Sequence, residues 1–280
     1  MSRIAPPPHR ARTSRPGSIT KQAATEIATL RRLFAAQVDH VARNPELAAE
    51  ARMDYLGAHF AMDLTLARHL RAVEQMMPHI RGRVLEWGCR HGLDSCVYRM
   101  RLGDAVELHG CDVCDVAVYK PFHDFSGLGY GRIIHPWRLD YPSDHFDVAT
   151  SNGVLEHVPD DAASAAEIFR LLKPGGMFVV TCLPNRYSYT EAFQRWRGNT
   201  AHDRLYTLRS AAALLRGAGF TVERTARFLM LPTMLNGFPA AIKRLYQRAH
   251  PVVAVANAAL ERAWPLSVLA SNLLLVARKP

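Results

Sequence analysis

The stretch Val84-Leu85-Glu86-Trp87-Gly88-Cys89-Arg90-His91-Gly92 decides the fold of this chain. A short apolar run ends in an acid and opens into a turn with glycines, after which the pattern becomes helical. A strand, a tight loop and a helix N-terminus in this order form a cradle for a nucleotide or a cofactor. Gly88 would let the backbone approach a ligand closely, and Glu86 would accept hydrogen bonds from an ammonium or hydroxyl group. An ordinary turn between a strand and a helix has the same pattern. The segments that follow must therefore decide between a cofactor cradle and an ordinary turn.

The segments after this stretch continue the alternation of strands and helices. Residues 106–111 predict a second strand that ends at Asp112. An acid at this position of a βαβ unit is well placed to accept hydrogen bonds from both hydroxyls of a ribose. Residues 148–151 and 177–182 predict two buried strands, and a hard turn at 173–176 precedes the second of them.

The rest of the chain predicts helices on both sides of these strands. Apolar residues at helical spacing predict helices between residues 20 and 79, the last of which ends at Pro78. The other predicted elements are helices at 162–172, 207–218 and 238–263, strands at 133–134, 220–224 and 272–277, and an irregular loop at 119–131. Strands that alternate with helices predict an α/β fold with a mostly parallel sheet that is covered on both faces.

We expect three segments along the chain. Residues 1–19 contain Pro6-Pro7-Pro8 and several arginines, which predicts a disordered basic tail. Residues 20–79 would form an N-terminal helical segment. Residues 80–280 would form the domain with the sheet, with a helical insertion at about 236–265.

The composition limits the classes of partner. The chain has 280 residues, of which 49% are hydrophobic, a formal net charge of +10 and a pI of about 9.7. A basic balance suits nucleic acid, an anionic membrane surface or an acidic substrate. The Lys and Arg residues are spread along the chain, which favours an ordinary solvated surface. There is no base-flipping motif and no separate recognition domain, so we expect no nucleic-acid partner.

The lack of a secretory signal and the spacing of the cysteines both point to a reducing compartment. No apolar run reaches about 18 residues, so we expect no transmembrane helix. The N-terminus has no apolar core of a secretory signal, although a transit peptide is an alternative to a disordered tail. The five cysteines have no framework spacing, which predicts reduced thiols in a cytoplasmic protein. Cys111-x-x-Cys114 lacks a second pair, and no other cluster has metal spacing, so we expect no metal site.

Four blocks together resemble the class I S-adenosylmethionine-dependent methyltransferases, and most closely the group that includes quinone-biosynthesis and many small-molecule methyltransferases. The blocks are residues 84–92, 110–112, 139–158 and 171–176. The resemblance covers about residues 80 to 230 and the last strand, and the ordered set is more specific than any single block. It implies a Rossmann-like, seven-stranded, mostly parallel sheet whose last strand is antiparallel.

The resemblance also implies S-adenosyl-L-methionine as cofactor and roles for particular residues. Glu86, Gly88, Cys89 and Gly92 would frame its methionine end, Asp112 would hold the ribose, Val113 would lie against the adenine, and Asn152 would lie near the sulfonium. Arg90 is a departure, because the family usually has glycine there; if this position needs a positive φ, arginine costs on the order of 1 kcal/mol. The acid that often binds the adenine amino group would fall near His135 rather than Asp140, so that contact stays unassigned.

Methyl transfer from a sulfonium is an in-line displacement, for which alignment is essential and a base is useful but not obligatory. The candidate catalytic residues are His157 and His202, with Asp203 as an alternative. A structural role in the loop is the simpler interpretation of His157. The candidates for acceptor contacts are Asn185, Tyr187, His202 and Tyr206. His202 and Tyr206 would share one face if their segment is helical.

Several hypotheses remain open for the acceptor. The first is O-methylation of a small-molecule, lipid-linked or glycan acceptor, and the second is C-methylation of a quinone-type precursor. A third is a non-catalytic protein that binds S-adenosylmethionine, which the Arg90 departure supports. The basic amphipathic stretch at 238–263 suits a peripheral contact with a membrane, for which a packing helix with a solvated face is the simpler interpretation. The sequence does not indicate an oligomeric state.

Overall fold

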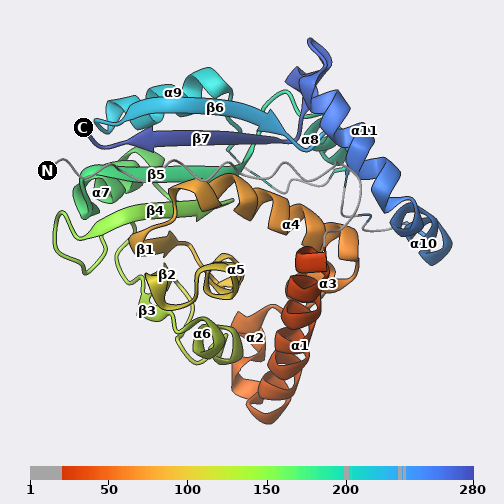
Figure 1. Ribbon diagram of the computed structural model, residues 1–280, viewed down its shortest axis with the longest axis horizontal. Coiled ribbons are helices and arrows are strands. Elements are labelled where there is room, and N and C mark those ends of the chain that lie inside the picture. The colour runs from red at the N-terminus through yellow and green to blue at the C-terminus, as the bar shows by residue number, and fades with distance from the viewer. Residues whose placement is uncertain (1–20, 199–201, 203, 233–234, 236–237) are drawn as a thin grey trace, which may run out of the picture.

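A seven-stranded sheet forms the centre of the computed structural model, which describes residues 21–198, 202, 204–232, 235 and 238–280 (Figure 1). The strands are β1 (Gly82–Trp87), β2 (Val106–Asp112), β3 (Gly129–Arg132), β4 (Phe146–Asn152), β5 (Leu172–Pro184), β6 (Thr221–Phe228) and β7 (Asn272–Arg278). Their order is β3-β2-β1-β4-β5-β7-β6, and β7 runs antiparallel to both of its neighbours. This confirms the mostly parallel sheet, with its antiparallel last strand, that the resemblance implies.

Alternation along the central strands divides the core into two layers. Val84 of β1 and Val148 of β4 belong to the cluster on one face, whereas the next residues, Leu85 and Ala149, belong to the cluster on the other. Successive side chains of a strand point to opposite faces of a sheet, and these strands are apolar on both. Helices therefore have to cover both faces.

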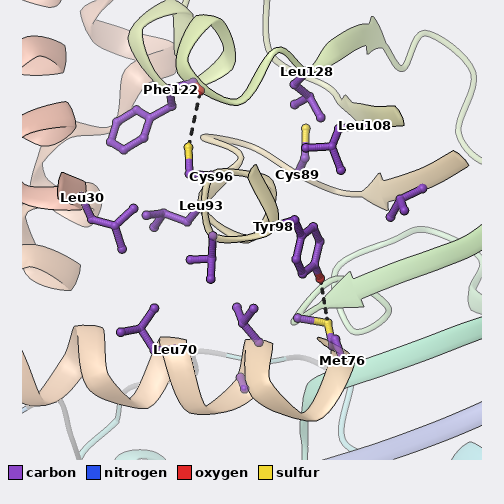
Figure 2. Packing of buried hydrophobic residues seen from close by; sticks show 14 of the residues in the cluster. Leu30, Leu70, Met76, Cys89, Leu93, Cys96, Tyr98, Leu108, Phe122 and Leu128 are labelled. Atoms are coloured by element: carbon purple, nitrogen blue, oxygen red, sulfur yellow. Dashed lines mark hydrogen bonds between the residues drawn. The ribbon is translucent and has the colours of Figure 1, made fainter. Parts of the chain in front are cut away.

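The first face is covered by the N-terminal helices and by the helices that follow β1 and β2 (Figure 1). These are α1 (Lys21–Arg43), α2 (Ala48–Ala51), α3 (Met53–Phe60), α4 (Asp63–Met76), α5 (Leu93–Leu102) and α6 (Lys120–Ser126), with short 3₁₀ turns η1 (Pro45–Leu47), η2 (Met77–His79) and η3 (Gly103–Ala105). Figure 2 shows α5 enclosed by side chains of α1, α4, α6 and the sheet. The Tyr98 hydroxyl donates to Met76 Sδ at 3.4 Å, and Cys96 Sγ donates to the Phe122 carbonyl at 3.4 Å. The N-terminal helical segment thus shares one core with the sheet.

The second face is covered by α7 (Asp161–Leu171) and α9 (Leu208–Gly217). Asp160 caps α7 by accepting a hydrogen bond from the Ala163 amide at 2.9 Å. Thr207 and Ser210 form a reciprocal capping box at the start of α9. Both helices lie within one or two residues of their predicted bounds.

The insertion between β6 and β7 is helical, as predicted, but it is divided into two helices and a turn. These are α10 (Ala240–Arg248), α11 (His250–Arg262) and η4 (Leu266–Leu269). They lie beyond the carboxyl ends of β4 and β5, close to α8 (Tyr189–Trp196) (Figure 1). Val253 of α11 packs in a small cluster with Met62 and Leu64, next to the start of α4. None of the helices in the described part of the chain is long and apolar enough to cross a membrane.

Some predicted elements were wrong. Residues 119–131 are not an irregular loop, because they form α6, a cap at Gly127 with φ +64° and the edge strand β3. The third strand lies at Gly129–Arg132 and not at Ile133–Ile134, because glycine-rich edge strands lack the β-branched signal. The turn at 173–176 is a bulge within β5, where the register shifts between Phe146↔Leu172 and Val148↔Met177. The predicted tail at 1–19 lies outside the described residues, and all five cysteines are free.

Candidate functional site

A cavity of about 1640 Å³ opens at the carboxyl ends of β1, β2, β4 and β5. It is bounded by the loops that follow these strands and β3, by residues of α3 and α4, and by α8. Ligands of open α/β sheets bind at this edge, where the strand order reverses from one side of β1 to the other. The topology therefore places the cavity where the sequence predicts a cofactor site.

Backbone geometry shapes the loop after β1. Gly88 has φ +71°, and a Cβ there would lie 2.5 Å from a methyl carbon of Val154. The amides of Gly88 and Cys89 donate to the Cys111 carbonyl at 2.9 and 3.0 Å, which fastens the loop to β2. We expected glycine here because of a close ligand, whereas the structure requires it for the backbone conformation and for contact with Val154.

Glu86 is buried at the bottom of this loop and lines the cavity. One of its carboxylate oxygens accepts from the Ser95 amide at 2.8 Å and from the Ser95 hydroxyl. Burial, and then the neighbouring Asp94 carboxylate, raise the pKa of Glu86 well above its usual value. A cation that binds beside it would lower this pKa, so Glu86 is suited to an ammonium group.

Asp112, at the end of β2, lies beside the same loop. Its Oδ2 accepts from the Arg90 amide at 2.8 Å, and its Oδ1 accepts from the Val113 amide at 2.7 Å. Each carboxylate oxygen can accept a second hydrogen bond, so the group can still bind two hydroxyls. Exposed apolar side chains continue the wall of the cavity from this point, namely Val113, Ile134 and Trp137. His135 is part of this wall and Asp140 is not, and the contact with the adenine amino group stays unassigned.

Arg90 does adopt the left-handed conformation, with φ +45°. Its Nε donates to the Tyr119 hydroxyl at 3.1 Å, and its guanidinium lies 4.5 Å from the centre of the Tyr55 ring. A cation–π contact contributes about 0.5–1 kcal/mol at a partly exposed position, which is similar in size to the backbone cost. The left-handed conformation of Arg90 is therefore accommodated by its contacts with α3 and with the segment after β2.

Polar residues that the sequence analysis missed lie at the start of α5 and on α4. Asp94 is 2% exposed, and its Oδ1 lies 2.8 Å from His69 Nε2. Asn152 Nδ2 donates to the two oxygens of Asp94 at 3.3 and 3.2 Å. Arg68 lines the cavity and forms no ion pair with a described carboxylate. This end of the cavity therefore presents carboxylates and an uncompensated guanidinium, which suits a zwitterionic ligand.

A second polar cluster lies farther along the cavity, after β4 and after α8. Glu156, His157 and His202 each place one donor atom within 4.8 Å of the others. The two imidazole rings are 5.5 Å apart, and His202 Nδ1 lies 3.0 Å from Glu191 Oε1. Burial raises the pKa of Glu156 to about 7. We call these four residues the acid–base cluster.

The sequence analysis expected no metal site, and this stays a prediction, but the fold brings three possible ligands together. A carboxylate and two imidazoles could each provide one ligand to a divalent cation. The sequence concealed this arrangement, because His202 is far along the chain from Glu156 and His157. Only the fold brings the segment after α8 against the loop after β4.

Three of the four predicted acceptor residues do not line this cavity. Asn185 is buried, and its Nδ2 donates to the carbonyls of Val268 and Ala270 at 2.8 and 2.7 Å. The buried Tyr206 donates to the Leu155 carbonyl at 3.1 Å and to Asp161. Tyr187 is exposed and lies beside a separate surface pocket.

His202 is the one of the four that lines the cavity, and it shares no helix with Tyr206, which pairs in a β-bridge with Asn185. Asp203 lies outside the described residues. Asn185 and Tyr206 thus have structural roles, since their polar groups are already satisfied by the protein.

Comparison with known proteins gives matches to a methyltransferase domain and to several methyltransferases. A family model described as a methyltransferase domain matches residues 40–225. The chain is 31% identical over 163 residues to the protein named Probable S-adenosylmethionine-dependent methyltransferase of Mycolicibacterium smegmatis, a match that covers 56% of this chain and 60% of the relative. It is 32% identical over 195 residues to the ubiquinone biosynthesis O-methyltransferase of Paramagnetospirillum magneticum, covering 65% and 74%. It is 28% identical over 144 residues to the demethylmenaquinone methyltransferase of Geobacillus kaustophilus, covering 46% and 60%.

Solved structures share the fold at low sequence identity. One of them comes from the complex between the Haloferax volcanii Trm112 methyltransferase activator and a methyltransferase. It matches with a TM-score of 0.58 at 18% sequence identity, over 84% of this chain and 98% of that one. Another is phosphoethanolamine N-methyltransferase 2 of Haemonchus contortus, with a TM-score of 0.51, 18% identity, and coverage of 76% and 52%. The family match across residues 40–225, together with the O-methyltransferase matched over 74% of its length, shows that the chain belongs to the S-adenosylmethionine-dependent methyltransferases.

Proposed function

We propose that this protein transfers the methyl group of S-adenosyl-L-methionine to a hydroxyl oxygen of a small-molecule acceptor, with lipid-linked phenols of the quinone-precursor type and glycans as the first classes to test. One observation carries the proposal: the residues suited to the cofactor and the acid–base cluster face the same cavity. The similarity to a ubiquinone biosynthesis O-methyltransferase supports the choice of oxygen and of a quinone-like acceptor.

The charges at the loop after β1 fit the methionine part of the cofactor. Its ammonium group would lie by Glu86 and Asp94, and its carboxylate would pair with Arg68. The residues inferred from the resemblance would add to this site: Gly88 and Cys89 at the methionine end, Asn152 near the sulfonium, Asp112 at the ribose and Val113 at the adenine all line the cavity, whereas Gly92 does not. When bound, the cofactor supplies a methyl group that a positively charged sulfur activates for displacement. The protein holds the two reactants in line, which is where most of the rate enhancement arises.

The acid–base cluster would remove the proton that a hydroxyl acceptor loses as its oxygen becomes methylated. His202 accepts this proton on one ring nitrogen, while Glu191, 3.0 Å from Nδ1, stabilises the resulting imidazolium. His157 is the second base candidate, because its ring lies 5.5 Å from that of His202. This arrangement favours an acceptor with an acidic hydroxyl, such as a phenol.

The test has two stages. Calorimetry with S-adenosylhomocysteine should show binding; its absence would favour a protein of this fold that no longer catalyses methyl transfer. Labelled S-adenosylmethionine is then offered to dihydroxyphenols with and without a polyprenyl tail and to glycans, and the product is examined by NMR. A methyl ether supports the proposal. A ring-methylated product would instead support C-methylation of a quinone precursor, which the similarity to a demethylmenaquinone methyltransferase favours as the second candidate.

A further inference from the structure

The insertion between β6 and β7 exposes an unusual amount of apolar surface. Within residues 238–269, which we call the docking surface, eight large apolar side chains are exposed: Phe238, Ile242, Leu245, Val252, Val255, Trp264, Leu266 and Leu269. The most exposed are Trp264 at 77%, Val252 at 71% and Leu245 at 69%. Single exposed apolar side chains are normal, but here they gather on α10, α11 and η4, which contact one another in turn, and such a group is a candidate surface for binding.

Helical periodicity arranges these side chains in stripes. Ile242 and Leu245 of α10 are three residues apart, as are Val252 and Val255 of α11, so each pair lies along one side of its helix, and Phe238 lies two residues before α10. The opposite side of α11 already packs on the protein, since Val253 is buried and Asn257 Oδ1 accepts from the Met230 and Leu231 amides at 2.7 and 3.0 Å. The inner side makes the contacts expected of a packing helix, whereas the outer side is not the polar solvated face that the simpler interpretation requires.

The exposed charges on the docking surface are all positive. Its cationic residues are Lys243, Arg244, Arg248 and Arg262. Its single acid, Glu261, has a side chain only 10% exposed, and this side chain forms an ion pair with Arg71. Apolar stripes flanked by cations and by an exposed tryptophan are typical of helices that lie in the interface of an anionic bilayer.

A second copy of the chain fits this surface poorly. In a two-fold dimer the same patch meets itself, so the cations of one copy would face those of the other. The anionic headgroups of a bilayer have the opposite charge and can surround each cation.

The docking surface adjoins the cavity. Leu229 and Pro232, in the segment that leads from β6 to α10, line the cavity, as do residues of α8. In Figure 1, α8, α10 and α11 lie at the same end of the sheet, beyond the carboxyl ends of β4 and β5. Phe193 and Trp196 of α8 add exposed aromatic side chains at this end.

We propose that α10, α11 and η4 bind the surface of an anionic lipid bilayer, with the apolar stripes at the boundary of headgroups and acyl chains. This contact stands independently of the methyl acceptor. If the acceptor is lipid-linked, it would bring the cavity close to the layer from which the acceptor comes.

The test is co-sedimentation of the full chain with vesicles of phosphatidylcholine alone or with 30% phosphatidylglycerol. The wild type should bind the anionic vesicles, and its binding should weaken as salt rises. The Lys243→Glu/Arg244→Glu variant should bind at least tenfold more weakly, because each cation near an anionic surface contributes about 1 kcal/mol. The Leu245→Ser/Trp264→Ser variant should also bind more weakly.

A matched control is Arg209→Glu/Arg216→Glu on α9, which changes charge equally at two exposed positions outside the docking surface. This variant should keep most of the binding. Equal loss in both charge variants would overturn the proposal, because it would show attraction to net charge alone. Absence of wild-type binding would also overturn it, as would sedimentation velocity showing a dimer that the Leu245→Ser/Trp264→Ser variant dissociates. Since no step depends on methyl transfer, failure here leaves the proposed activity untouched.

Discussion

The two ends of the cavity are constructed in different ways. The end that we propose holds the cofactor, which we call the cofactor end, is formed mainly by residues 86–94 and by Asp112, whose positions follow from the turn after β1 and from strand pairing. The end that we propose holds the acceptor, which we call the acceptor end, is assembled from side chains of separate segments, with Glu156 after β4, Glu191 on α8 and His202 after α8. The cofactor end is thus formed mostly by residues close together in the sequence, whereas the acceptor end is formed by residues far apart in it. Substitutions should therefore have separable effects at the two ends.

The largest effect is expected for Gly88→Ala. The new methyl group would overlap Val154 and would occupy a left-handed backbone, which together cost about 2–4 kcal/mol in the free energy of unfolding. Gly127→Ala is the matched control, because Gly127 is left-handed with φ +64° and ψ +33°, and the nearest atom to the added carbon is Nη2 of the flexible Arg99 side chain at 3.3 Å, so it should cost only about 1 kcal/mol. Urea unfolding measures both, and equal costs would contradict the role assigned to Val154.

At the acceptor end, His202→Gln should lower kcat by about 100-fold, which is typical for loss of a general base. Affinity for S-adenosylhomocysteine should stay unchanged, because His202 belongs to the other cluster. The measurement is a comparison of steady-state rates with calorimetry. A loss of cofactor affinity in this variant would break the division of the cavity into two ends.

At the cofactor end, Asp112→Ala should weaken S-adenosylhomocysteine binding by about 30-fold, since hydrogen bonds to a charged group contribute about 1.5–3 kcal/mol. Asp140→Ala is the control, because Asp140 is exposed and does not line the cavity. Calorimetry on both variants gives the result, and similar affinities would remove the ribose-binding role from Asp112.

Substitution of Arg68 should separate binding of the methionine carboxylate from binding of the nucleoside at the cofactor end. Arg68→Met should weaken S-adenosylhomocysteine binding by about tenfold, as expected for loss of one ion pair in a cavity. It should leave the affinity for methylthioadenosine unchanged, because that nucleoside has no carboxylate. Asp112→Ala should weaken both ligands, and Arg68→Lys should recover part of the affinity. If Arg68→Met weakens both ligands equally, Arg68 does not hold the carboxylate.

The same contrast explains what the sequence could predict. The strands, the loop around Gly88 and the acid at Asp112 were predictable, because each depends on neighbouring residues and on strand periodicity. Arg68 and His69 were missed, because they lie on a helix whose apolar stripe hid the polar side facing the cavity. Asn185 and Tyr206 were assigned to the acceptor, but both donate hydrogen bonds to backbone carbonyls of other segments. A polar residue in an irregular segment can have this structural role as readily as it can bind a substrate.

The smallest effect should come from the buried acid of the acceptor end. Its folded-state pKa of about 7 lies above its ordinary value of 4.5, so the Glu156 carboxyl keeps its proton in the folded protein when the unfolded chain has already lost it. The stability associated with the neutral acid is complete below pH 4.5 and is lost as the pH rises through 7. Between pH 6 and 8, wild-type stability should therefore fall by about 1 kcal/mol relative to Glu156→Gln, which keeps the shape without the titration. Urea unfolding of both proteins across this range measures the difference, and parallel curves would mean that Glu156 is ionised in the folded state, paired with the histidines beside it.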